Sequence, residues 1–120
     1  MITKFRIDES VAKEEFGLAC QRLIPWPTDS DSAEEPPLGA MACFLRPGGS
    51  SLPDCHNQDE FMLILSGTGT LDLDGESASF EKGDLLVLPR NQEHVVHNGS
   101  DDENLVWVSL YWPLREVPLS

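Results

Sequence analysis

Two histidines stand in blocks whose spacing suits a metal site. The first block reads Asp54-x-His56-x3-Glu60, and the second places His94 five positions after Pro89. Imidazole nitrogens and carboxylate oxygens are donors that divalent transition metals take from proteins. Both blocks lie in segments with a strand-like pattern, so two distant strands could build one site. The expected metal ligands are His56, Glu60, His94 and Asp54.

Strand geometry indicates which side chains can meet. Asp54 and His56 are two residues apart, so on a strand both project from the same face. Glu60 follows a polar turn and can open the next antiparallel strand beside His56. Apolar residues that share a face with Glu60 or His94 are expected to back the metal ligands and form a partly dry substrate pocket. These pocket residues are Met62, Ile64 and Val96.

The two blocks resemble the paired motifs of the cupin superfamily. In the first, His56, Glu60 and Gly67 fall on the second histidine, the glutamate and the closing glycine. Two positions depart from the family pattern: Asp54 replaces the first ligand histidine, and Asn91 replaces a glycine. Asparagine tolerates a positive φ better than most residues, so the second change is mild. The matching positions of the second motif are Gly83, Pro89, His94 and Asn98.

This resemblance covers roughly residues 39 to 112 and implies an all-β fold, a double-stranded β-helix or jelly-roll barrel. The apolar segments from residue 39 onward are short and regularly spaced, as such a barrel requires. They span 41–45, 61–65, 70–73, 78–80, 85–88, 94–97 and 105–112. Asp74-Gly75 predicts a two-residue hairpin turn, and residues 8–16 could form the one short N-terminal helix expected.

The chain length predicts one domain. With 120 residues, of which 40% are hydrophobic, the chain can bury a single modest core. Within it, we expect residues 1–38 to form a strand or helix and an acidic, proline-rich loop packed on a barrel of residues 39–120. The loop is expected from Pro25 to Pro37.

Composition excludes several classes of partner. Against 21 acidic residues there are only 8 basic ones, for a net charge of −13, which argues against nucleic acids and anionic membranes. No apolar run is long enough to span a bilayer, and the charged N-terminal segment argues against a secretory signal. Three irregularly spaced cysteines suit reduced thiols, so a cytoplasmic location is expected.

Asp54 leaves two kinds of metal centre open. If its carboxylate reaches the ion, two carboxylates and two imidazoles neutralise a divalent charge. If it falls short, His56, His94 and Glu60 remain as the 2-His-1-carboxylate arrangement typical of non-haem Fe(II) oxygenases, and Asp54 is free as a general base. Both centres suit Fe(II), Mn(II), Zn(II) or Ni(II).

The sequence therefore favours a small metal-dependent cupin enzyme that acts on a small polar molecule, with Asp54 or Glu60 as catalytic residues that assist proton transfer. The resemblance implies dioxygenase, isomerase or lyase chemistry, or a zinc cupin of a biosynthetic pathway. The alternatives are a non-catalytic binding or sensor cupin and a structural barrel without metal. A homodimer is predicted, because small cupins commonly pair and the β-like segment Thr3–Ile7 lacks an obvious partner strand.

Overall fold

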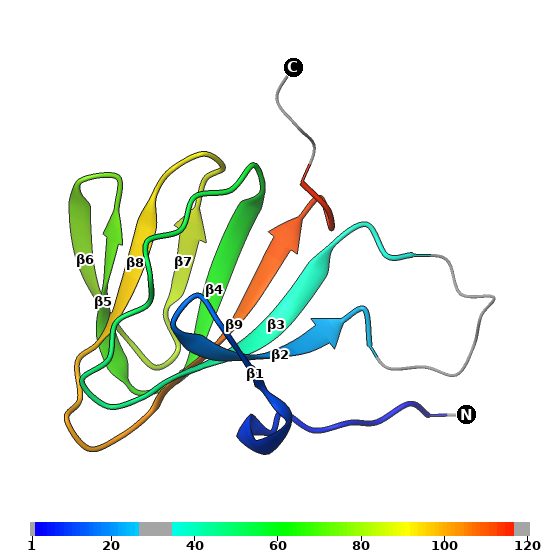
Figure 1. The fold of residues 1–120 in the computed structure, drawn as a ribbon, viewed down its shortest axis with the longest axis horizontal. Helices are drawn as coiled ribbons and strands as arrows, with labels where there is room; N and C mark the ends of the chain where they lie inside the picture. Colours follow the sequence, from blue (N-terminus) through cyan, green and yellow to red (C-terminus); the bar gives the residue numbers. More distant parts are fainter. Residues whose placement is uncertain (1, 27–34, 117–120) are drawn as a thin grey trace.

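Two antiparallel β-sheets make up the part of the chain that the computed structural model describes, residues 2–26 and 35–116 (Figure 1). The larger sheet has the strand order β1-β2-β3-β9-β4-β7, and the smaller has the order β6-β5-β8. The strands are β1 (Lys13–Glu15), β2 (Leu18–Ile24), β3 (Gly39–Leu45), β4 (Asp59–Ser66), β5 (Thr68–Leu73), β6 (Glu76–Glu81), β7 (Leu85–Leu88), β8 (His94–Asn98) and β9 (Leu105–Trp112). The all-β expectation and each strand expected from residue 39 onward are confirmed.

The core lies between the inner faces of the two sheets, and β4 shows how the sequence selects that face. Glu60, Met62 and Ile64 alternate along β4 and are all buried, whereas Leu63 points to the exposed side. Alternate residues of a strand project from opposite faces, so this pattern places one side of β4 against the core. The core is completed by residues of seven other strands: Leu18, Cys20, Cys43, Leu45, Leu71, Phe80, Leu88, Val96, Leu105 and Trp107.

Two-residue turns join two of the strand pairs. Asp74 and Gly75 both have positive φ, 47° and 90°, and connect β5 to β6 as the sequence predicted. Phe16 and Gly17 have φ values of 55° and 76° and connect β1 to β2. Positive φ at both central residues gives a turn whose twist matches that of the flanking strands, so both connections are tight hairpins.

The N-terminal region differs from the expectation. The helix predicted over residues 8–16 is a single 3-10 turn, η1 (Glu9–Val11), in which the Ser10 N–H donates to the Asp8 side chain at the N-cap. Lys13–Glu15 pairs with β2 instead, because the hairpin turn at Phe16 brings it back along that strand. No strand forms over Thr3–Ile7. Within the described ranges, no helix is long and apolar enough to cross a lipid bilayer.

Strand β2 was not predicted from the sequence, and it contributes seven residues to the larger sheet. It pairs with β3 over most of its length, with Cys20 opposite Cys43 and Arg22 opposite Met41. Residues before 39 therefore contribute strands to the sheet itself. Of the loop expected from Pro25 to Pro37, residues 27–34 lie outside the described residues.

Candidate metal centre

The segment that follows β3 brings the two motifs together. It runs beside β8 in Figure 1 and makes two isolated antiparallel bridges to it, Ser50 with His97 and Asp54 with His94. At the second bridge the backbone N–H of His94 donates to the Asp54 carbonyl at 2.9 Å, and the N–H of Asp54 donates to the His94 carbonyl at 3.1 Å. Main-chain hydrogen bonds thus hold Asp54 beside His94.

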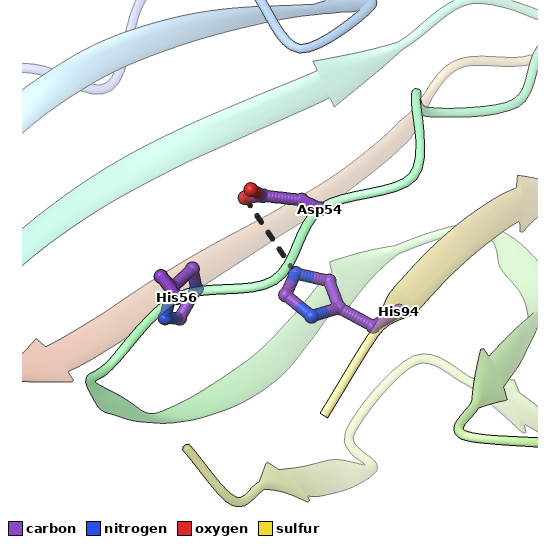
Figure 2. A group of neighbouring side chains, drawn as sticks. All are labelled: Asp54, His56 and His94. Carbon is purple, nitrogen blue, oxygen red and sulfur yellow. Dashed lines mark ion pairs between the residues drawn. The ribbon is translucent and has the colours of Figure 1, made fainter. Parts of the chain in front are cut away.

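Asp54, His56 and His94 form a group of possible metal ligands. One donor atom from each lies within 4.8 Å of those of the other two. Figure 2 shows the three side chains converging, with a dashed line from the Asp54 carboxylate to His94. Asp54 Oδ2 and His94 Nε2 are 3.9 Å apart. The two imidazole rings meet edge to face, with their centroids 5.3 Å apart. The close approach of Asp54 and His56 fits their expected position on one face of an extended segment.

Glu60 joins this group through His56. One of its carboxylate oxygens, Oε1, lies 3.0 Å from His56 Nε2, and the residue is only 5% exposed. Glu60 is not one of the three residues whose donors converge within 4.8 Å. The structure therefore places Glu60 in contact with one expected ligand, His56, and Asp54 close to both histidines.

A second set of contacts fixes the loop that precedes His94. Asn91 has a positive φ of 65°, the conformation expected where the family pattern has glycine, and its N–H donates to the His56 carbonyl at 2.8 Å. Arg90 forms an ion pair with Asp59 at 3.0 Å and also donates its backbone N–H to that carboxylate. These contacts tie the loop before β8 to the segment that carries His56, so the two histidines are positioned from both sides.

The donor set fits a divalent transition metal. Three ligands bound about 2.1 Å from one ion lie about 3.0 to 3.6 Å from one another, so side-chain movements of about 1 Å would gather donors that now lie within 4.8 Å of one another. The buried Nδ1 of His56 has no hydrogen-bond partner among the described residues. A buried polar atom without a partner is costly, and such an atom is available to an ion or a ligand.

Electrostatics at His56 favour its protonated form in the metal-free protein. The hydrogen bond to the Glu60 carboxylate raises the pKa of His56 above its ordinary value, and the charges of Glu60 and Asp54 act in the same direction, against an opposing effect of burial. An opposite charge within a few ångströms favours the charged form of a titrating group. A proton and a metal ion would therefore compete for this imidazole.

A cavity of about 410 Å³ opens at the metal-ligand group. Of the three expected pocket residues, Met62 and Val96 line it, whereas Ile64 is buried farther along β4 in the core. Glu60 also contributes to the wall. Several other lining residues were not predicted, because they lie on strands outside both motifs: Arg22, Met41, Cys43, Trp107, Ser109 and Tyr111.

Asn98, the last residue of the second motif, has a structural role in this geometry. Its buried side-chain amide donates to three backbone carbonyls, those of Leu45, Arg46 and Glu103, at distances from 2.8 to 3.1 Å, and its Oδ1 accepts from the Ser100 N–H at 2.9 Å. These bonds join the end of β3 to the end of β8 and the turn before β9. Asn98 therefore holds strand ends in place and does not face the cavity.

Comparison with known proteins agrees with the motif assignment. Residues 42–111 match the family model of the cupin domain. The plu4264 protein of Photorhabdus luminescens is similar over 93% of this chain and 88% of its own, with 26% identity and a TM-score of 0.80. A Cupin 2 conserved barrel domain protein from Salinispora arenicola is 28% identical, with a TM-score of 0.80 and coverages of 93% and 89%. KdgF from Halomonas sp., at 21% identity, 86% coverage of each chain and a TM-score of 0.67, shares the fold.

Proposed function

The chain belongs to the cupin family, and we propose that it is a small metal-dependent enzyme acting on a small polar molecule bound at a mononuclear centre in the barrel. The observation that carries this proposal is the convergence of Asp54, His56 and His94 at the wall of a cavity. Its volume of about 410 Å³ lies within the range of pockets that bind small molecules. The fold alone would not suffice, because one fold hosts many functions.

Each residue of the group has a distinct task in this proposal. His56 and His94 ligate as neutral imidazoles. Asp54 ligates as a carboxylate, and the proximity of its donor atom to those of both histidines supports this assignment over a role as a free base. Glu60 accepts a hydrogen bond from His56 and can ligate or take up a substrate proton at Oε1. A divalent ion held there would act as a Lewis acid toward a substrate oxygen.

The cavity walls supply the remaining conditions for catalysis. Met62, Val96 and Trp107 present apolar surface beside the polar group, which limits water near the reacting atoms and strengthens electrostatic interactions there. Ser109 is buried at the wall, and its hydroxyl accepts a hydrogen bond from Trp107 Nε1 at 3.0 Å. The indole is thereby held in one orientation against the cavity.

The experiment that tests this function has two stages. Protein stripped with chelator is first reconstituted separately with Fe(II), Mn(II), Zn(II) and Ni(II), and bound metal is measured. Each loaded form is then incubated with a panel of small polar substrates, the Fe(II) form with and without dioxygen, and products are followed by mass spectrometry. Turnover by a metal-loaded wild-type form, together with no turnover by the His94→Ala variant, supports an enzymatic function. Tight metal binding without turnover of any compound favours a binding or sensor cupin.

The proposal extends to the assembly and location of the protein. An apolar strip lies on the exposed side of the larger sheet at its β7 edge, where Leu85 and Val87 are 54% and 63% exposed and pair with Leu63 and Phe61 of β4. Apolar surface of this kind is typical of protein interfaces, which supports a homodimer. The cysteines of the described chain, Cys20, Cys43 and Cys55, are free thiols, which supports a reducing compartment such as the cytoplasm.

A further inference from the structure

Arg22 is a cation on the cavity wall that neither motif contains. Along β2, Leu18 and Cys20 point into the core, and Arg22 follows on the same face, so its side chain lines the cavity. Gln21 points to the other face, where it bonds the N-terminal segment at Arg6 and Asp8. The guanidinium thus reaches the cavity because of strand alternation, on a strand that otherwise supplies core residues.

We propose that Arg22 binds a carboxylate of the substrate, and that the substrate is a small molecule with an oxygen donor for the metal at one end and a carboxylate at the other. The inference rests on the proposed function for the metal-binding end only. Three strand steps of the larger sheet separate β2 from β4, which carries Glu60, and at about 4.8 Å a step this is about 14 Å of curved sheet. A ligand of several carbon atoms fits between the two ends.

Neighbouring side chains hold the guanidinium in place. Its Nη1 donates to Tyr111 Oη at 3.2 Å and to Met41 Sδ at 3.0 Å, and its Nη2 donates to Glu15 Oε1 at 2.9 Å. Tyr111 can reach Arg22 because its ring occupies the space where a Cβ on Gly39 would stand. A guanidinium oriented in advance loses less entropy when it binds a planar anion, which favours recognition of a carboxylate.

The ion pair with Glu15 leaves Arg22 available to a ligand. The side chains of Arg22 and Glu15 are 47% and 34% exposed, and exposed ion pairs of this kind contribute little to stability. A guanidinium has five N–H groups in a fork that matches a carboxylate, and the three contacts described here use two of its nitrogens. A substrate carboxylate can therefore bind beside Glu15 or displace it.

A second arginine lines the cavity but is less suited to this role. Arg115 is 78% exposed at the side chain and forms an ion pair with Glu35. Among the contacts of the described residues, Arg115 has no hydrogen bond to an aromatic hydroxyl or a sulfur atom of the kind that holds Arg22. Arg115 is for this reason the matched control for Arg22.

The cavity wall between Arg22 and the metal-ligand group determines which kind of chain can join the two ends of the ligand. Met41, Cys43, Met62 and Trp107 line it, and all but Met41 are almost completely buried. Burial of apolar surface against these side chains favours a short hydrocarbon body over a polyhydroxylated one. The substrate class is therefore a short-chain carboxylic acid with a second oxygen function at its far end.

The test uses dicarboxylates and their half-amides as probes. Malonate, succinate, glutarate and adipate carry two carboxylates at increasing separation, so the one whose length matches the site can place one carboxylate at the metal and the other at Arg22, whereas a half-amide keeps only one anion. Binding to protein loaded with Zn(II) is measured by calorimetry, after metal content has been determined for every variant. We expect one diacid to bind about ten-fold more tightly than its half-amide, as for the loss of a charge-assisted hydrogen bond. A phosphonate in place of the distal carboxylate should bind no more tightly.

Variants test which residue causes the preference for the diacid over its half-amide. Arg22→Gln should reduce it to about two-fold or less while retaining bound metal, Arg115→Gln should leave it unchanged, and Glu15→Gln should strengthen diacid binding by removing a competing carboxylate. Equal binding of diacid and half-amide by the wild type, or an undiminished preference in Arg22→Gln, would overturn the proposal. So would tighter binding of the phosphonate.

Failure of the metal site can be distinguished from failure at Arg22. If the wild type binds no metal, the proposed function fails, and Arg22 is examined in the metal-free protein by NMR of its Nε–Hε group. Glutaramate, which carries one carboxylate, should still shift this resonance, and neutral glutaramide should not. Identical responses to both compounds would contradict anion recognition by Arg22.

Discussion

Asp54 and His94 exchange a reciprocal pair of backbone hydrogen bonds, at 3.1 and 2.9 Å, although they belong to different motifs. The two strand-like segments are therefore joined at the residues proposed to hold the metal. Because these bonds use main-chain atoms only, a change of either side chain leaves the frame of the site in place. Substitutions here should alter metal binding far more than they alter the fold.

Substitution of Asp54 tests whether this carboxylate is a ligand. Asp54→Ala should weaken metal affinity by about 10- to 100-fold, as loss of a supporting group at a metal site commonly does, whereas Asp54→His should preserve or strengthen it by restoring the usual family donor. Competition with a chromogenic chelator measures both. Unchanged affinity in Asp54→Ala would move this residue from ligand to general base.

Asn98 should be important for stability and not for chemistry. Asn98→Ala leaves the buried carbonyl of Leu45 and the part-buried carbonyls of Arg46 and Glu103 without this donor, and we expect a loss of about 3 kcal/mol in the free energy of unfolding. Urea denaturation of the metal-free protein measures this. Asn104→Ala, which removes one exposed hydrogen bond to Glu9, is the control and should cost less than about 0.5 kcal/mol. Equal losses in both variants would contradict the role given to Asn98.

Much of the fold could be predicted because the informative residues are local in sequence. Period-2 alternation around Met62 and the Asp74-Gly75 turn each specify their own strand or hairpin. The motif spacing likewise identified Asp54, His56 and His94, which the structure brings together. The family pattern alone, which has glycine at position 91, was enough to predict a positive φ there, and Asn91 has one.

The rest depended on contacts between distant segments. Lys13–Glu15 resembles a helix in isolation, and only pairing with β2 makes it a strand. Arg22 lies outside both motifs and reaches the cavity through the register of β2 on β3. Ile64 shares a face with Met62, yet the cavity ends before it. None of these outcomes follows from local propensity, because each is fixed by tertiary packing.

Protons should compete with the metal ion for His56, so metal binding should stabilise the protein less at low pH. Its pKa is raised in the folded, metal-free protein, chiefly by the Glu60 carboxylate. The stabilising contribution of this pair is fully present below about pH 6.5, the unfolded value, and is lost as pH rises through the higher folded value. Metal binding requires the neutral imidazole, so metal stabilises the protein more as pH rises.

Thermal melting from pH 5 to 8 measures this competition. We expect the difference in Tm between metal-loaded and chelator-treated protein to grow with pH and to be smallest at pH 5. Glu60→Gln removes the carboxylate that chiefly raises the pKa of His56. Protons should therefore stop competing with the metal ion for His56 at a lower pH than in the wild type. Superimposable curves for loaded and stripped wild-type protein would mean that no histidine-ligated ion supports this fold.

The exposed apolar strip at β7 should mediate self-association. Light scattering at micromolar concentration should give twice the 13.3 kDa mass of the chain, and Val87→Asp should give the monomer because it places a charge in the interface. Val11→Asp changes a residue of similar exposure, 59% against 63%, away from this strip and should remain dimeric. A wild-type mass of one chain would reject the homodimer.

The central claim is that one divalent ion binds where the two motifs meet, and the metal content of the purified protein tests it most directly. Elemental analysis of protein prepared without chelator should find close to one transition-metal ion per chain. His56→Ala and His94→Ala should each lose most of it while retaining the circular dichroism of a β-sheet protein, because the group that binds the metal includes one histidine from each motif. Wild-type metal content in both folded variants would contradict the account.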